Sequence, residues 1–121
     1  MTRQYYPLTH PQKRIWFGEK LTPGHDFANI SGRITIQGPA STTALSQALN
    51  RILQKNAGLR LRFVELEGED DAFANARQYV AEYQPVRITV LDYSHASLAE
   101  VDDWCLAESA KPFQLLDADL Y

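Results

Sequence analysis

The chain has 121 residues, 45% of them hydrophobic and 22% charged, and a formal net charge of -3 at pH 7. This length and composition fit one globular domain with a modest core. The mild acidity and the lack of a dense Lys/Arg run argue against binding to nucleic acid or to an anionic membrane surface. Because no apolar run reaches the length of a signal peptide core or a membrane span, we expect a cytoplasmic protein.

The first predicted element is a helix that begins at Thr9. Thr9 and Gln12 have the spacing of a capping box, in which each side chain bonds the backbone of the other residue. Pro11 falls in the first turn, where its missing N–H costs nothing. The helix is predicted to continue through residues 13–20 and to end at the turn that begins at Thr22.

A half-buried strand is predicted next over residues 30–37, because Ile34 and Ile36 alternate with polar residues. The clearest helix of the sequence follows, capped by Ser41 or Thr42. Its apolar residues recur at helical spacing and predict one buried stripe: Leu45, Ala48, Leu49, Ile52 and Leu53. Gly58 is expected to close this helix in the left-handed conformation.

A strand is predicted over residues 59–66, in which Arg60 and Arg62 would share one face and leucine and phenylalanine the other. A weaker strand is predicted over residues 74–80, because alanine has a poor strand preference. A cleaner strand should run from Val86 to Asp92.

The last predicted helix starts at a second capping box, formed by Ser97 and Glu100, and ends before Pro112. Its inward stripe would include the single cysteine, Cys105, as a buried structural thiol. The order of elements predicts an α+β fold, with helices on one face of a mostly antiparallel sheet. Residues 114–121 begin a further segment, so the chain is expected to be incomplete.

Catalytic motifs are sparse in this sequence. It has no nucleophile elbow, no phosphate-binding glycine loop and no histidine paired with a nucleophile at a known spacing. The three histidines lack metal-ligand spacing, so no metal site is expected. The acidic pairs Asp70-Asp71 and Asp102-Asp103 are interpreted as solvated charge, because the first pair falls in a polar, hairpin-like turn and the second on a helix, where neighbours point apart.

Several local patterns together resemble the condensation domains of nonribosomal peptide synthetases. The opening motif of that family is matched by Pro7-Leu8-Thr9-x-x-Gln12-x-Arg14-Ile15-Trp16-Phe17, followed by Leu21-x-Pro23-Gly24 and Asn29-Ile30. The second motif, Arg-His-Glu-x-Leu-Arg-Thr-x-Phe, is similar to residues 55–63. Further agreement lies at Gln78, Asp92, Ser94 and the run Pro112-Phe113-x-Leu115. The resemblance covers nearly the whole chain.

The second motif also shows departures from the family. Leu59, Arg60 and Phe63 agree with it, whereas Lys55, Asn56, Ala57 and Leu61 replace Arg, His, Glu and Thr. The resemblance implies a chloramphenicol acetyltransferase-like fold of two lobes with the active site in a tunnel between them. The catalytic motif His-His-x-x-x-Asp-Gly does not occur in the sequence. Residues 1–121 are therefore expected to form the N-terminal lobe and to end before that motif.

The resemblance also implies roles for particular residues. Gln12 and Arg14 are expected to border the tunnel, and Arg60 to act as a structural clamp whose partner lies beyond Tyr121, with Arg62 beside it. The alternative is that these arginines coat a strand facing solvent. Trp16 and Phe17 are interpreted as packing residues rather than substrate contacts.

Two functions remain open from the sequence. In the first, the chain is part of an enzyme that joins a carrier-protein-bound acyl or peptidyl thioester to an aminoacyl acceptor, forming an amide. The chain would bind no cofactor directly, because phosphopantetheine on the donor and acceptor carrier proteins holds the substrates. It would lack the catalytic motif and be inactive alone. In the second, it is a non-catalytic α+β module that recruits a partner at a sheet edge. An incomplete lobe should expose apolar surface and self-associate.

Overall fold

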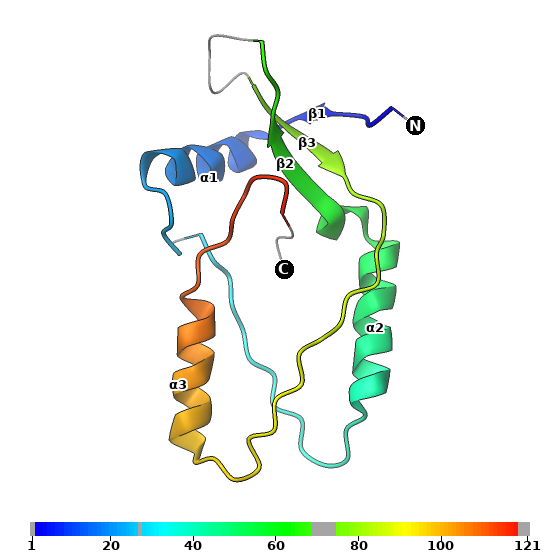
Figure 1. Ribbon diagram of the computed structural model, residues 1–121, viewed down its shortest axis with the longest axis vertical. Helices are drawn as coiled ribbons and strands as arrows, with labels where there is room; N and C mark the ends of the chain where they lie inside the picture. Colours follow the sequence, from blue (N-terminus) through cyan, green and yellow to red (C-terminus); the bar gives the residue numbers. More distant parts are fainter. Residues whose placement is uncertain (1, 27, 69–74, 119–121) are drawn as a thin grey trace.

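A computed structural model describes residues 2–26, 28–68 and 75–118. In these ranges the elements are β1 (Tyr6–Pro7), α1 (His10–Leu21), α2 (Thr42–Lys55), the 3-10 helix η1 (Ala57–Arg60), β2 (Leu61–Glu65), β3 (Ala76–Val80) and α3 (Leu98–Ser109). The three strands form one antiparallel sheet in the order β1-β3-β2 (Figure 1). The described chain therefore has the predicted α+β class, with three α-helices and a small sheet.

The helices begin at the predicted caps. In α1 the Gln12 N–H donates to Thr9 Oγ1 at 3.5 Å, and the Thr9 N–H donates to Gln12 Oε1 at 2.8 Å. α2 is capped by Ser41, whose Oγ accepts from the Ala44 N–H at 3.1 Å. Before α3, Ser97 and Glu100 make the same reciprocal pair as in α1. Each cap satisfies backbone donors that a helix start would leave without partners.

The core lies where α1 crosses the sheet. Leu8, Trp16 and Ala76 form the buried apolar cluster, and Phe63 and Leu115 pack against it. The Trp16 and Phe63 ring centroids are 6.1 Å apart. As predicted, Trp16 is a packing residue, and it is only 4% exposed. Phe17 keeps 38% of its surface exposed.

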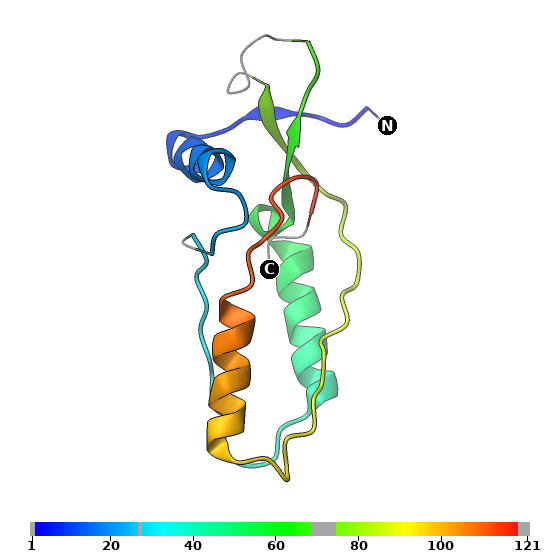
Figure 2. The same cartoon turned by 60° about the vertical axis from the view of Figure 1, so that its left-hand side comes forward.

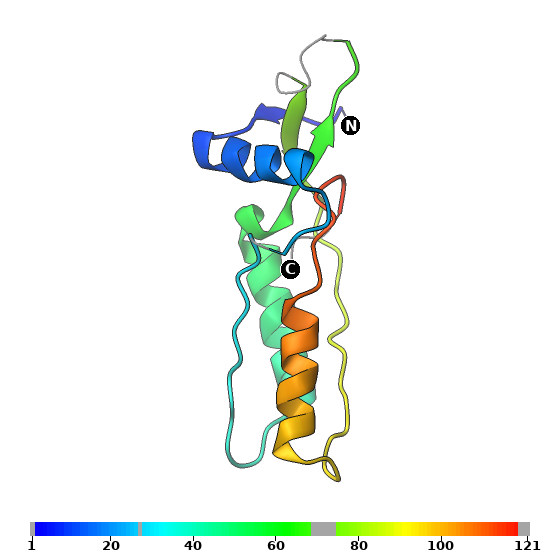
Figure 3. The ribbon, with the colours of Figure 1, turned by 90° about the vertical axis from the view of Figure 1, so that its left-hand side faces the viewer.

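The other two helices lie beyond one end of the sheet. Figures 1–3 show α2 and α3 extending downward from it. η1 joins α2 directly to β2, whereas a long stretch without helix or strand lies between β3 and α3. The expectation that the helices cover one face of the sheet is therefore wrong for α2 and α3. Among the described helices, only α1 contributes a residue to the buried cluster against the sheet.

Two predicted strands are absent from the described structure. Residues 30–37 and 86–92 are extended but form no ladder, because the only sheet in the described ranges contains β1, β2 and β3. At Val86 the side chain of Asn50 on α2 replaces a strand partner. Its Oδ1 accepts from the Val86 N–H at 2.8 Å, and its Nδ2 donates to the Val86 carbonyl at 2.9 Å. Alternation of apolar and polar residues thus does not show that a neighbouring strand is present to pair with the segment.

The connection from α2 to β2 also differs from the prediction. α2 ends at Lys55 with Asn56 as its C-cap, and Gly58 lies inside η1 without a positive φ, so its predicted left-handed role is wrong. Because η1 includes Arg60, β2 starts only at Leu61. Arg60 and Arg62 therefore do not share one face of a strand. The weakly predicted strand is confirmed as β3, whereas Ala74 and the Asp70-Asp71 turn lie outside the described residues.

The predicted C-terminal segment adds to the sheet. Leu116 forms a parallel bridge with Phe63, and the Asp117 N–H donates to the Phe63 carbonyl at 2.8 Å. The other edge of β2 is already paired with β3. The end of the described chain therefore lies against the free edge of β2.

Candidate functional site

Gln12 and Gln78, both positions of the family resemblance, form a reciprocal amide pair. Gln12 Nε2 donates to Gln78 Oε1 at 2.7 Å, and Gln78 Nε2 donates to Gln12 Oε1 at 3.0 Å. Gln78 Nε2 also donates to the Pro7 carbonyl at 2.9 Å. Gln78 is only 7% exposed, so these bonds satisfy an amide that would be costly to bury alone. The pair fixes α1 against β3.

Arg60 binds three backbone carbonyls. Its Nη1 donates to the carbonyls of Leu53 and Gln54 at 2.5 and 2.8 Å, and its Nε donates to the Ala81 carbonyl at 3.0 Å. Two of these oxygens belong to the last turn of α2, where carbonyls lack helical partners. The third follows β3. Arg60 therefore clamps α2 to the sheet within this chain, and these three acceptors precede Tyr121.

Arg62 lies in β2, buried to 7% exposure and opposite Tyr79 of β3. Its Nη1 donates to the Leu61 carbonyl at 2.8 Å. The Tyr79 hydroxyl donates to a carboxylate oxygen of Asp117, and the Arg3 guanidinium carbon lies 4.0 Å from the centre of the Tyr79 ring. Burial, followed by the bond to Asp117, raises the pKa of Tyr79. This cluster holds the C-terminal segment beside β2.

The four predicted site residues do not form one cluster. Gln12 lies at the contact of α1 with the sheet, Arg60 at the end of α2, and Arg62 within the sheet. Arg14 is exposed on α1. Whether any of them borders a substrate tunnel stays a prediction, since their described contacts are structural.

A hollow of about 540 Å³ lies between α1, β2 and residues 113–115; we call it the α1 hollow. Ile15 and Trp16 line it from α1, Phe63 from β2, and Phe113 and Leu115 from the C-terminal segment. Its polar lining residues are Gln12, Glu19, His25 and Asn29. This size and largely apolar lining are those of a small-molecule pocket.

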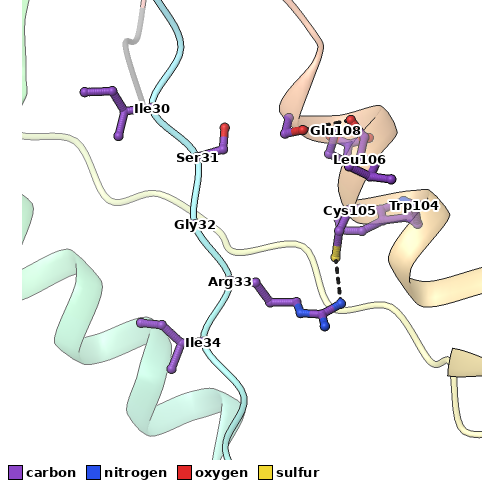
Figure 4. A pocket seen from close by; sticks show the side chains of 10 residues that line it. Ile30, Ser31, Gly32, Arg33, Ile34, Trp104, Cys105, Leu106 and Glu108 are labelled. Atoms are coloured by element: carbon purple, nitrogen blue, oxygen red, sulfur yellow. Dashed lines mark hydrogen bonds between the residues drawn. The ribbon is translucent and has the colours of Figure 1, made fainter. Parts of the chain in front are cut away.

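A second hollow, of about 670 Å³, lies between α3 and residues 30–34 (Figure 4). The Arg33 guanidinium reaches across it to Asp102 at 2.5 Å and to Cys105 Sγ at 3.9 Å. Cys105 is partly exposed, so the prediction of a buried thiol is wrong: residues 30–34 stand away from α3 and leave the cysteine on the wall of the hollow. Asp102 is a half-exposed ion-pair partner of Arg33 rather than a lone solvated charge.

Two further positions of the resemblance, Asp92 and Ser94, make a local turn. The Ser94 N–H donates to Asp92 Oδ1 at 2.9 Å. Hydrogen bonds from the Ser94 hydroxyl and N–H lower the pKa of Asp92. The pair therefore shapes the backbone before α3, as aspartate and serine commonly do in turns.

Metal sites and membrane spans are absent from the described ranges. No cluster of three or more His, Cys, Asp or Glu side chains there has the arrangement of a metal site. None of the helices there is long and apolar enough to cross a bilayer. The cytoplasmic location expected from the sequence stays a prediction.

Comparison with known proteins gives the family. The model of the family "Condensation domain" matches residues 2–121. One of the plipastatin synthase subunits of Bacillus subtilis is 29% identical over 121 residues, which cover 100% of this chain and 4% of that protein. Surfactin synthase subunit 1 of the same organism is 31% identical over 121 residues, 97% of this chain and 3% of that protein.

The nonribosomal peptide synthetase penN of Penicillium thymicola is 29% identical over 104 residues, 86% of this chain and 4% of that protein. The chain thus spans only a few per cent of the length of these relatives. Nearly every residue of the chain, including the paired Gln12 and Gln78, falls within the family match. The chain belongs to the condensation-domain family, and its relatives are subunits of nonribosomal peptide synthetases.

Proposed function

We propose that this chain is the N-terminal part of a condensation domain with the chloramphenicol acetyltransferase-like fold. The whole domain would form an amide between a donor thioester and an aminoacyl acceptor, both held on the phosphopantetheine of carrier proteins. The observation that carries this proposal is the family match over residues 2–121. The pairing of Leu116 with the edge of β2 supports it, because the C-terminal segment adds to the sheet.

The catalytic group of the whole domain would come from the motif His-His-x-x-x-Asp-Gly, which this sequence lacks. The second histidine of that motif would act as a base or would position the acceptor amine for attack on the thioester carbonyl. Residues 2–118 would form one wall of the reaction tunnel. In this role Gln12 and Arg60 keep α1 and α2 fixed against the sheet.

We predict that the 121-residue chain alone forms no amide, because it lacks the motif whose second histidine would act as the base or position the attacking amine. The measurement is product formation, by mass spectrometry, from loaded donor and acceptor carrier proteins. A longer protein that continues through the histidine motif should form product, and its variant with alanine in place of the second histidine should not. Amide formation by the 121-residue chain alone would contradict the proposal.

We also propose that this chain self-associates. Ile30, Ile34 and Ile36 lie on one extended stretch and are 99%, 87% and 56% exposed. Large apolar side chains left exposed in this way favour association. The same stretch forms no ladder, so it would also serve the alternative function, a module that recruits an extended partner chain.

Sedimentation of the purified chain should therefore show a mass that rises with concentration. The variant Ile34→Lys should shift the distribution toward the monomer, whereas Leu21→Lys, at an exposed residue that ends α1, should not. A chain that stays monomeric at every concentration and unfolds cooperatively would contradict self-association.

A further inference from the structure

α2 leaves most of its apolar stripe uncovered. Of the five residues predicted to be buried there, only Leu53 is, at 6% exposure. Leu45, Leu49 and Ile52 keep 41%, 45% and 49% of their surface exposed. They lie three or four residues apart and therefore form one row along the helix. An exposed apolar row on a folded chain marks a surface that a partner covers.

Only one side of this row is free for a partner. On the side of Leu53, the Asn50 side chain bonds to residues 83–86 of the same chain. The opposite side carries Arg51 and Lys55, which follow each other by one helical turn. Because α2 contains no acidic residue, the free side of the row is positively charged.

A groove of complementary character lies elsewhere on the chain. The second hollow, of about 670 Å³, is lined by Ile30 and Ile34 on one side and by Leu106 of α3 on the other; we call it the α3 hollow (Figure 4). These three side chains are 99%, 87% and 68% exposed. α3 carries four carboxylates and no lysine or arginine, and Arg33 and Lys111 pair with two of them. The α3 wall of the hollow therefore has an excess of negative charge.

We propose that two copies of this chain associate by placing α2 of one copy in the α3 hollow of the other. The apolar row of α2 contacts Ile34 and Leu106, and its free side turns Arg51 and Lys55 toward Glu108, which lines the hollow. An amphipathic helix in an apolar groove is a common mode of recognition. This inference rests on the self-association proposed above and names the two surfaces that meet.

Charge selects α2 as the occupant. It brings two cations and no carboxylate to a wall with excess negative charge, whereas α3 of a second copy would bring carboxylates to carboxylates. α1 already packs against the sheet of its own chain through Trp16. The ion pair of Glu108 with Lys111 is exposed on both sides, so it contributes little and can be exchanged for a contact with Arg51.

The single cysteine of the chain reports on this contact. Cys105 is partly exposed on the wall of the α3 hollow, so α2 of a second copy would shield its thiol. The measurement is the rate at which iodoacetamide, a neutral reagent, alkylates Cys105, followed by mass spectrometry over a range of chain concentrations. The rate should fall about fivefold from concentrations below the association midpoint to concentrations above it, as most copies become paired.

Charge reversal tests the assignment of the two surfaces. Arg51→Glu and Glu108→Lys, both at exposed positions, should each weaken association about tenfold and remove the shielding of Cys105, because like charges then meet. An equimolar mixture of the two variants should recover the shielding, since the reversed α2 of one then meets the reversed α3 of the other. Arg14→Glu, at an exposed position on α1, should change neither quantity.

Circular dichroism checks that each variant folds, and if one does not, the shielding of Cys105 in the unaltered chain still decides. A chain whose mass rises in sedimentation while Cys105 reacts at one constant rate would overturn this contact and leave self-association through another surface. Charge reversals that leave the shielding intact, or a mixture that fails to restore it, would overturn the contact as well. A chain that stays monomeric at every concentration would overturn both proposals.

Discussion

Replacing Arg60 with methionine should lower the free energy of unfolding by about 2–4 kcal/mol, because three backbone carbonyls, two of them in partly buried hydrogen bonds, lose a charged donor. Methionine keeps much of the length of the arginine side chain, so the loss reports on the hydrogen bonds more than on packing. Urea unfolding, followed by far-ultraviolet circular dichroism, measures this free energy. The slope of the free energy against urea concentration should not change if the substitution leaves the unfolded state unaffected.

Two control variants sharpen this result. Arg60→Lys keeps the positive charge but lacks the planar fork that reaches both α2 and Ala81, so it should recover only part of the loss. Arg51→Met removes an exposed arginine of α2 and should change stability by less than about 0.5 kcal/mol. Equal effects of Arg60→Met and Arg51→Met would show that Arg60 is no clamp.

Replacing Gln78 with methionine should lower the free energy of unfolding by about 2–3 kcal/mol. The Gln12 amide and the Pro7 carbonyl would lose their hydrogen-bond partner while staying partly buried. The same urea titration measures this change. Both amides lie at the contact between α1 and β3. Relative to the unaltered chain, the variant should therefore lose more hydrogen-exchange protection in α1 than in α2.

A double-mutant cycle separates the amide pair from the other roles of Gln12, which also completes the cap of α1. The double variant Gln12→Met, Gln78→Met should lose less unfolding free energy than the sum of the losses in the two single variants. The difference, which is the coupling energy of the pair, should be about 1–2 kcal/mol. Strict additivity of the two substitutions would mean that the reciprocal pair contributes nothing to stability.

Local signals in the sequence predicted the helices well. The caps Thr9, Ser41 and Ser97 are each at the start of a helix, because a capping residue and the backbone it satisfies lie within one turn. The weak strand predicted over residues 74–80 is present as β3, residues 76–80, and it is the central strand of the sheet. Its position in the sheet was not predictable, because the choice of neighbours depends on residues far away in sequence.

The two failed strand predictions share one physical cause. Residues 30–37 and 86–92 alternate as strands do, but alternation describes the two faces of a strand and carries no information on which groups bond its backbone. At Val86 that partner is an asparagine side chain on a helix. For Gly58 the prediction rested on glycine's tolerance of positive φ, whereas the 3-10 turn that holds Arg60 in place uses an ordinary φ.

Only part of the candidate site could be predicted from the sequence. Gln12 and Gln78 were singled out by the resemblance, but their mutual bonds join residues 66 positions apart and follow only from the fold. Tyr79 and Asp117 gave no sequence signal, because each needs the C-terminal segment in place beside β2.

The strand order has a consequence for how the chain is synthesised. Pro7 pairs with Arg77, and Phe63 pairs with Leu116, so each edge of the sheet joins regions made far apart in time on the ribosome. α2 needs only neighbouring residues and can form while the chain is still growing. The sheet cannot have all of these partners until Leu116 has left the exit tunnel, so until then the edge of β2 that Leu116 covers depends on other protection from misassembly.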